Sequence, residues 1–245
     1  THVAGIAVAG NPYARLANAR IEFGHTLQPD PCPSLELTLK DARNTQAYVD
    51  FFRRHRVRVV NMSFGGSVGG VEGQLEQCGI GASADERRKI AREWFDIGKE
   101  AFVKAMASAP EVLFVAAAGN ENADSSFAES IPADIVLPNL ITVGAVDKAG
   151  DEAPFTSYGK TVVVHANGYL VDSVIPGGER LAESGTSMSA PQVTNLAAKI
   201  LAVNPALTPP QVIAIIRETA EKTADGRRVL IHPRKAIAAA QAKQG

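Results

Sequence analysis

Gly185-Thr186-Ser187-Met188-Ser189-Ala190-Pro191 is the stretch that decides the fold. It places Ser187 between a glycine and an apolar run whose three-to-four-residue spacing is typical of one buried face of a helix. Ser187 is therefore expected at a helix N-terminus, where unpaired N–H groups and the positive end of the helix dipole favour a developing oxyanion. An ordinary N-cap serine is the alternative interpretation, since serine is a preferred capping residue. The apolar run comprises Val193, Leu196, Ala197, Ile200 and Leu201.

Length and composition favour a globular protein with a large core. The chain has 245 residues, 45% of them hydrophobic, which is enough for one domain or two. Its 25 basic and 26 acidic residues give a formal net charge of -1, which argues against nucleic acid or a membrane surface as a partner. The longest apolar stretch, Val112 to Ala118, has the length of a strand and is far short of a membrane span.

The two cysteines, Cys32 and Cys78, lie far apart in turn-rich segments and form no CxxC pair. A single disulfide and two free thiols are both compatible with this spacing. The cysteines therefore do not indicate a redox compartment.

Strand-like and helix-like segments alternate along the chain, which predicts an α/β fold with a largely parallel sheet. Because the apolar strands have no polar alternation, we expect three layers, with helices on both faces of the sheet. Residues 67–82 are interpreted as a long glycine-bearing loop. Strands are predicted over residues 19–23, 56–61, 112–115, 141–146 and 162–166. Helices are predicted over residues 1–9 and 40–54, and two more are predicted to begin at Thr208 and Pro233. Another helix is predicted to begin at the capping box of Ser83 and Glu86, and its apolar stripe comprises Ile90, Trp94, Ile97, Ala101 and Ala105.

Polar residues and glycines follow the ends of these strands, where parallel sheets bind their ligands. Ser63-Phe64-Gly65 follows one strand, and Gly119-Asn120 follows another. Asn120 could supply an amide donor to an oxyanion, whereas its alternative role is that of a turn former after glycine.

Three blocks resemble, in order, the subtilisin-like serine proteases, or subtilases. The resemblance runs from Thr1 to about Ala240 and is weaker around Cys32, over residues 67–82 and over residues 123–137. Thr142-Val143-Gly144-Ala145-Val146 is similar to the strand between the last two blocks. The blocks are Val59-Val60-Asn61-Met62-Ser63-Phe64-Gly65-Gly66, Val115-Ala116-Ala117-Ala118-Gly119-Asn120-Glu121 and Gly185-Thr186-Ser187-Met188-Ser189-Ala190-Pro191.

The resemblance implies a serine endopeptidase that acts through an acyl-enzyme at Ser187. The Ser187 backbone N–H and the Asn120 side chain would form the oxyanion hole, and Thr186 would support that hole. Ser63-Phe64-Gly65 and Ala117-Ala118-Gly119 would line the two sides of the substrate cleft. A polypeptide substrate would then bind as an added strand, held by main-chain hydrogen bonds.

The start of the sequence implies that the catalytic base is missing from it. Thr1-His2-Val3-Ala4-Gly5 resembles the family block His-Gly-Thr-His-Val-Ala-Gly, in which the first histidine is the base and the second, matched by His2, is structural. The family order of Asp, His and Ser puts the aspartate further upstream still. Residues 1–245 are therefore expected to be the C-terminal portion of one N-terminally truncated, subtilisin-like peptidase domain. With no base, this chain alone is expected to have little or no activity. The missing N-terminal segment and a propeptide are further candidate partners.

The other histidines offer weaker alternatives. His25 and His55 are expected to be solvated, and His165 is expected to be a hydrogen-bonded core residue. Ser187, Asp225 and His232 follow the chain order of α/β-hydrolases. That fold needs a G-x-S-x-G elbow, but Ser189 stands where its second glycine would be.

No cofactor is expected. The G-x-G-x-x-A pattern at residues 79–84 follows polar residues and not a strand, so it lacks the context of a dinucleotide site. Calcium is possible from the family resemblance, but no Asp or Glu spacing matches a calcium loop and no metal site is identifiable. The family also implies a secreted or periplasmic protein, although the sequence carries no signal-peptide pattern.

A catalytically silent homologue that binds peptides or regulates another protein is the second functional hypothesis. Retention of both Ser187 and Asn120 favours the peptidase, because peptide binding alone needs neither residue.

Overall fold

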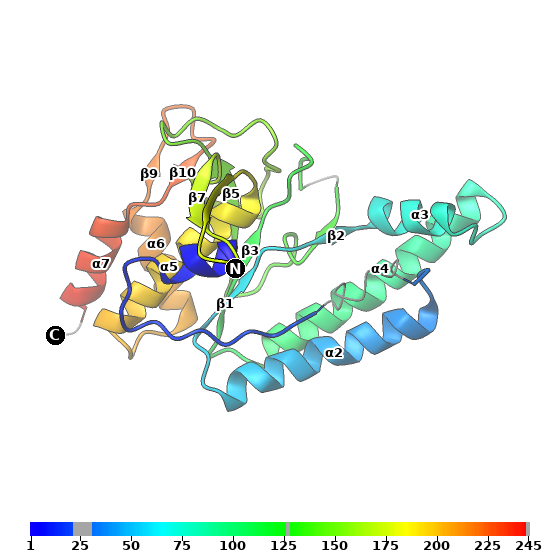
Figure 1. Cartoon of the computed structure of the whole chain (residues 1–245), viewed down its shortest axis with the longest axis horizontal. Helices are drawn as coiled ribbons and strands as arrows, with labels where there is room; N and C mark the ends of the chain where they lie inside the picture. The colour runs from blue at the N-terminus through cyan, green and yellow to red at the C-terminus, as the bar shows by residue number, and fades with distance from the viewer. Residues whose placement is uncertain (22–30, 126–127, 244–245) are drawn as a thin grey trace.

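A computed structural model describes residues 1–21, 31–125 and 128–243, and it is built around a six-stranded sheet (Figure 1). The strand order is β1-β3-β5-β6-β10-β9. The first five strands run parallel to their neighbours, and β9 pairs antiparallel with β10. The strands are β1 (Val59–Met62), β3 (Leu113–Ala117), β5 (Leu140–Val146), β6 (Val162–Asn167), β9 (Glu221–Lys222) and β10 (Val229–Leu230).

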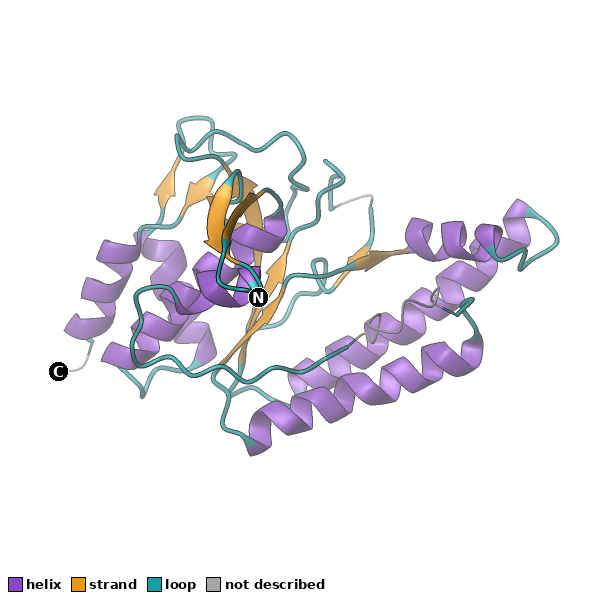
Figure 2. Ribbon diagram, in the orientation of Figure 1, coloured by secondary structure: helices purple, strands orange, loops and turns teal. Residues whose placement is uncertain are grey.

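Helices cover both faces of this sheet, which confirms the predicted three-layer α/β fold (Figure 2). Along β3, Leu113 and Val115 join the core on one face, and Phe114 and Ala116 join the core on the other. Because both faces are covered, β3 and β5 are buried at every position, as continuous apolar runs predict. One face carries α5 (Thr186–Val203), α6 (Pro209–Thr219) and α7 (Pro233–Ala242), and the other carries α2 (Leu35–Arg54) and α4 (Ala84–Ala107).

Smaller elements complete the described fold. Helix α1 (His2–Val8) packs against α5, and it ends before Asn11 as predicted. Two further sheets pair β2 (Gly66–Ser67) with β4 (Ser130–Ile131) and β7 (Val171–Val174) with β8 (Arg180–Glu183).

Helix termini follow the predicted chemistry. The Ser83 hydroxyl accepts a hydrogen bond from the Glu86 N–H at 3.2 Å, and the Glu86 carboxylate accepts one from the Ala82 N–H at 2.7 Å. Thr208 and Gln211 form a capping box at the start of α6. These bonds satisfy N–H groups that have no partner inside their helices.

Three predictions about local structure were wrong. Residues 67–82 are not a loop, because α3 (Val68–Gln77) packs on α4 and tolerates its three glycines, Gly69, Gly70 and Gly73. The strand predicted over residues 19–23 is absent at residues 19–21, which belong to no strand or helix, and its remainder lies outside the described residues. On α4 only Ala105 of the predicted stripe is fully buried, because the helix turns Ala91, Phe95 and Met106 inward.

Cys32 and Cys78 form a disulfide with a Cα–Cα distance of 5.8 Å. This bond joins the chain just before α2 to the residue that ends α3. The disulfide therefore adds a covalent link to the packing on α4 at the C-terminal end of α3, whose glycines give it a low intrinsic helix propensity.

Reduction of this disulfide is predicted to lower the free energy of unfolding by about 2–4 kcal/mol. The reason is that the unfolded chain loses a cross-link between positions 46 residues apart and so gains conformational entropy. Urea denaturation of the native protein and of Cys32→Ser/Cys78→Ser measures the change. Equal midpoints for the two proteins would contradict the prediction.

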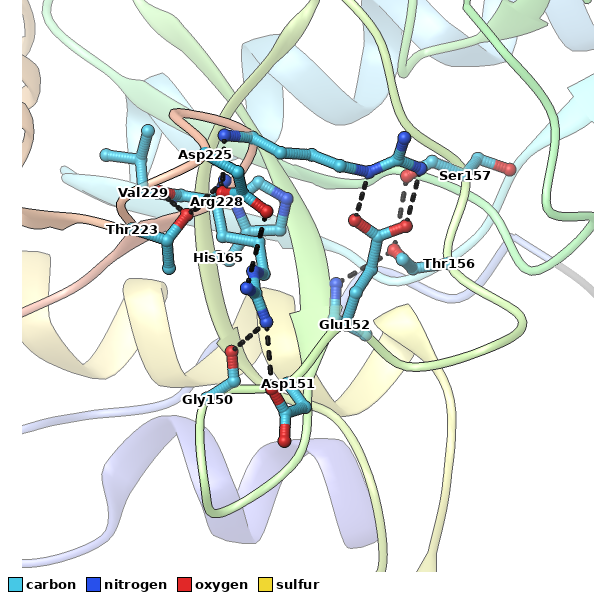
Figure 3. Close-up of polar contacts among 12 residues, drawn as sticks. Gly150, Asp151, Glu152, Thr156, Ser157, His165, Thr223, Asp225, Arg228 and Val229 are labelled. Atoms are coloured by element: carbon cyan, nitrogen blue, oxygen red, sulfur yellow. Dashed lines mark hydrogen bonds and ion pairs between the residues drawn. The ribbon is translucent and has the colours of Figure 1, made fainter.

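A polar cluster fastens the β9–β10 hairpin to the sheet (Figure 3). The buried His165 of β6, 4% exposed, accepts a hydrogen bond at Nδ1 from the Val229 N–H at 3.2 Å, as predicted for a core histidine. Burial lowers the pKa of the His165 imidazole, while the Glu152 carboxylate opposes that shift. The Arg227 guanidinium, which donates two hydrogen bonds to Glu152, holds the pKa of that carboxyl below its usual value.

His165 is predicted to make unfolding easier as the pH falls. Its folded pKa lies below the ordinary 6.5, so the unfolded state binds the proton more tightly and stability is lost below about pH 6.5. Arg228 and Arg227 also face this imidazole and disfavour its charge, whereas Glu152 favours it.

Urea denaturation between pH 7.5 and 5 tests this effect, whose slope is at most about 1.4 kcal/mol per pH unit. His165→Gln should flatten the slope, and His55→Gln, at the exposed end of α2, should keep it. An unchanged slope in His165→Gln would refute the assignment.

Candidate active site

The first turn of α5 presents Ser187 at the carboxyl edge of the sheet. Gly185, with φ of 154°, precedes the helix, and its own N–H donates to the Gly168 carbonyl at 2.8 Å. Ser187 is not the N-cap residue, so the capping interpretation was wrong. Its backbone N–H lies in the first turn, where N–H groups have no carbonyl partner within the helix.

Asn120 reaches this turn from the end of β3. Its Oδ1 atom accepts hydrogen bonds from the Thr186 N–H at 2.8 Å and from the Thr186 hydroxyl at 2.9 Å. These bonds join positions 66 residues apart, so the alternative role of Asn120 as a local turn former does not explain the position of its side chain. With Oδ1 held in this way, the exposed amide presents its Nδ2 donor beside the residue that precedes Ser187.

Thr186 binds the strand end to the helix start. It is fully buried, and its hydroxyl both donates to Asn120 and accepts from the Gly119 N–H at 3.2 Å. Gly119 has φ of 107°, a backbone conformation that favours glycine, and a Cβ there would lie 2.5 Å from the Glu121 carboxylate. The geometry therefore requires glycine at this position.

The two segments assigned to the cleft walls follow adjacent strands. Met62 pairs with Ala116 at the ends of β1 and β3, so both segments leave the sheet at the same edge. One wall segment is Ser63-Phe64-Gly65, which contacts Ser187, and the other is Ala117-Ala118-Gly119, which contacts Thr186. The structure joins Ser63, Gly119, Asn120, Thr186 and Ser187 by hydrogen bonds, and the other predicted residues are neighbours of Ser63 and Gly119 in the chain.

Ser63 and Ser187 are joined by two reciprocal hydrogen bonds. The Ser63 hydroxyl donates to the Ser187 carbonyl at 2.8 Å, and the Ser187 hydroxyl donates to the Ser63 carbonyl at 3.4 Å. Sequence reasoning missed two residues behind this pair: Asn61 donates to the Ser63 hydroxyl at 2.8 Å, and Thr194 donates to Asn61 at 3.0 Å. The available signal was a polar Asn61 at the end of an apolar strand.

No histidine among the described residues forms a hydrogen bond with Ser187. His2 is buried and donates to the Leu181 carbonyl at 2.9 Å, which ties α1 to β8. His55 is exposed at the end of α2, and His165 bonds to Val229. His25 lies outside the described residues.

The α/β-hydrolase alternative was wrong. His232 accepts a hydrogen bond from the Lys235 N–H at 3.3 Å and so caps α7. The Asp225 carboxylate instead accepts from the Thr223 hydroxyl and the Arg227 N–H. The three residues therefore do not form a triad with Ser187.

Carboxylates next to β4 have opposite pKa shifts. Burial raises the pKa of Asp134, whose carboxylate accepts hydrogen bonds from the Ser130 N–H at 2.6 Å and from Thr161 at 3.3 Å. The Arg92 guanidinium, 2.9 Å from Glu129, lowers the pKa of that carboxyl. Glu129 is thus held as an anion in a pair with Arg92.

Across residues 1–21, 31–125 and 128–243, His, Cys, Asp and Glu side chains form no group of three that could hold a metal ion. Within the same ranges, none of the helices combines the length and apolar character needed to cross a membrane.

Comparison with known protein sequences agrees with the motifs. The subtilase family (Peptidase_S8) matches residues 1–235. Subtilisin of Bacillus pumilus is 39% identical over 113 residues, which are 46% of this chain and 39% of that protein. M-protease of Shouchella clausii (strain KSM-K16) is 31% identical over 166 residues, which are 68% of this chain and 42% of that protein. The matches cover under half the length of these curated relatives.

Solved structures show the same fold. A cold adapted subtilisin-like serine proteinase has a TM-score of 0.58 and 27% identity, covering 78% of this chain and 61% of its own. A lanthipeptide protease has a TM-score of 0.61 and covers 81% of this chain and 66% of its own. At 18% identity, the lanthipeptide protease supports the fold alone.

Thr186→Val is predicted to destabilise the protein by about 1–3 kcal/mol, because the Gly119 N–H then loses its buried acceptor. Thr186→Ser keeps the hydroxyl and should lose less. Urea denaturation compares the two variants with the native protein, and a Thr186→Val variant that is as stable as Thr186→Ser would contradict the prediction.

Proposed function

This chain belongs to the subtilase family, and from that premise we propose that it forms the nucleophile and cleft side of a serine endopeptidase. The proposed reaction is hydrolysis of a peptide bond through an acyl-enzyme at Ser187. One observation carries the proposal: Asn120 is bonded to Thr186, the residue directly before Ser187. An amide donor and a hydroxyl therefore lie at the start of one helix.

In the proposed mechanism the Ser187 hydroxyl attacks the peptide carbonyl carbon, and a base takes its proton. The carbonyl oxygen becomes an oxyanion, which the Ser187 N–H and the Asn120 Nδ2 group stabilise. Because Thr186 already holds the amide oxygen, the donor needs little reorganisation when the charge develops. The leaving amine takes a proton, and water then hydrolyses the ester.

The proposed substrate is an extended polypeptide. It would lie between Ser63-Phe64-Gly65 and Ala117-Ala118-Gly119 and add to them as a strand. The support for this role is that both segments leave the same sheet edge and contact the first turn of α5.

The base and its acidic partner are proposed to come from polypeptide outside this sequence, such as a segment encoded before Thr1 or a separate N-terminal segment. In the described structure Ser187 donates to a carbonyl, which is not a base at neutral pH. Thr1 and the edge strand β1 border a hollow of about 1170 Å³, with side chains such as Val59 and Phe52 in its lining. We propose that this hollow is where the additional polypeptide packs. On this proposal the present chain alone has little or no activity.

A catalytically silent peptide-binding or regulatory homologue is the second candidate. The hydrogen bond from Ser187 to a carbonyl favours it, because nothing among the described residues activates the hydroxyl. The exposed, oriented amide of Asn120 favours the peptidase.

Export from the cytoplasm is proposed on two grounds, the family membership and the Cys32–Cys78 disulfide, since disulfides persist in oxidising compartments. The proposed reaction uses hydroxyl, amide and N–H groups and requires no cofactor. A structural calcium ion, which the family resemblance allows, stays a prediction.

Labelling with a serine-reactive fluorophosphonate tests the proposal. We expect labelling of the complete encoded protein, none of its Ser187→Ala variant, and little of this chain alone. A complete protein that is not labelled would favour the silent homologue.

In the same complete protein, Asn120→Ala should lower kcat about a hundred- to a thousandfold, with a much smaller change in KM. That magnitude comes from subtilisin itself, so it is an expectation carried over from the family. Asn139→Ala, which removes a buried amide far from the site, is the matched control for stability. An equal kcat loss in both variants would argue against an oxyanion role.

A further inference from the structure

Pro191 leaves the carbonyl of the nucleophile without its helical partner. In an α-helix, the carbonyl of residue 187 accepts from the N–H of residue 191, and proline has no N–H. The ring of Pro191 also crowds this carbonyl. The Ser187 carbonyl therefore takes a donor from outside the helix, the Ser63 hydroxyl at 2.8 Å.

The Ser63 hydroxyl is oriented by the residue behind it. Asn61 Nδ2 donates to Ser63 Oγ at 2.8 Å and so takes one of the two lone pairs of that oxygen, while the single hydroxyl proton is donated to the Ser187 carbonyl. The Asn61 amide is itself oriented, because its Oδ1 accepts from the Thr194 hydroxyl at 3.0 Å. A series of hydrogen bonds, each running from donor to acceptor, therefore connects the Thr194 hydroxyl through Asn61 and Ser63 to the Ser187 carbonyl.

The position of Asn61 makes this chain more than a surface contact. Val60 and Met62 of β1 face the core under α2 and α4, so Asn61 lies on the opposite face, where Val59 packs against the other core. Thr194 is 8% exposed on α5. A polar pair in this half-buried layer is unfavourable unless it is hydrogen-bonded, and here both ends of the amide are bonded.

We propose that Asn61 and Thr194 are positioning residues for the nucleophile. They act through Ser63, which replaces the hydrogen bond that Pro191 cannot give and so fixes the helical turn that carries Ser187. The catalytic part of this inference rests on the proposed function. The series of hydrogen bonds from Thr194 to the Ser187 carbonyl does not depend on that function.

The hydrogen bond can be tested in the present chain without any activity. Asn61→Ala should move the Ser187 carbonyl-carbon NMR shift in the direction of a lost hydrogen bond. Adding Pro191→Ala supplies a backbone N–H to the same carbonyl and should move the shift back. A Ser187 shift that Asn61→Ala leaves unchanged would overturn the inference, whatever the protein's activity.

The positioning role is tested in the complete protein. Asn61→Ala should lower kcat and the rate of fluorophosphonate labelling about tenfold, the size expected for one hydrogen bond. In a Pro191→Ala background the same substitution should have a clearly smaller effect. An equal loss in both backgrounds would show that Asn61 acts only through stability and would overturn the positioning role.

Two further comparisons separate orientation from stability. Thr194→Val should lower kcat, whereas Thr194→Ser should keep kcat near the native value, because only the hydroxyl orients Asn61. Asn204→Ala removes a buried amide at the other end of α5, where it donates to the Ala240 carbonyl at 3.2 Å, and should lower stability without lowering kcat. Activity that is unchanged in Asn61→Ala refutes the positioning role alone. A complete native protein that is neither active nor labelled refutes the proposed function and the positioning role together.

Discussion

The hydrogen bonds between Thr186 and Asn120 are the constraint on which the rest of the site depends. They attach the end of β3 to the first turn of α5, and they orient the Asn120 amide by holding its oxygen. The parallel sheet makes this contact possible, because the ends of β1 and β3 emerge at one edge, where α5 begins. The buried hydroxyl of Thr186 bonds to both the strand end and the amide, so one residue sets the position of the Asn120 side chain relative to the turn that carries Ser187.

A second constraint comes from the helix itself. Its N-cap residue, Gly185, has no side chain to cap the first turn, and Pro191 removes a backbone donor one turn later. The turn is therefore held from outside, by Asn120 at its N–H end and by Ser63 at the Ser187 carbonyl. A serine held in this way is fixed by two different strands, so its geometry depends on the packing of the whole sheet against α5.

Much of the fold and the candidate site could be predicted from the sequence. Continuous apolar runs identified β3 and β5, and Ser83 and Thr208 marked helix starts, because these signals are local. Helix α3 was missed because its glycines disfavour a helix, and packing on α4 overrides that preference. The disulfide and the chain through Asn61 could not be derived, because each joins residues that are distant in sequence and meet only in the folded chain.

The central claim is that Ser187 and Asn120 act on the same carbonyl oxygen. A crystal structure of the complete protein with a fluorophosphonate bound at Ser187 measures this most directly. The account predicts that the phosphonyl oxygen lies within about 2.7–3.1 Å of both the Asn120 Nδ2 atom and the Ser187 backbone nitrogen. A phosphonyl oxygen that points away from Asn120, with that amide bonded elsewhere, would contradict it.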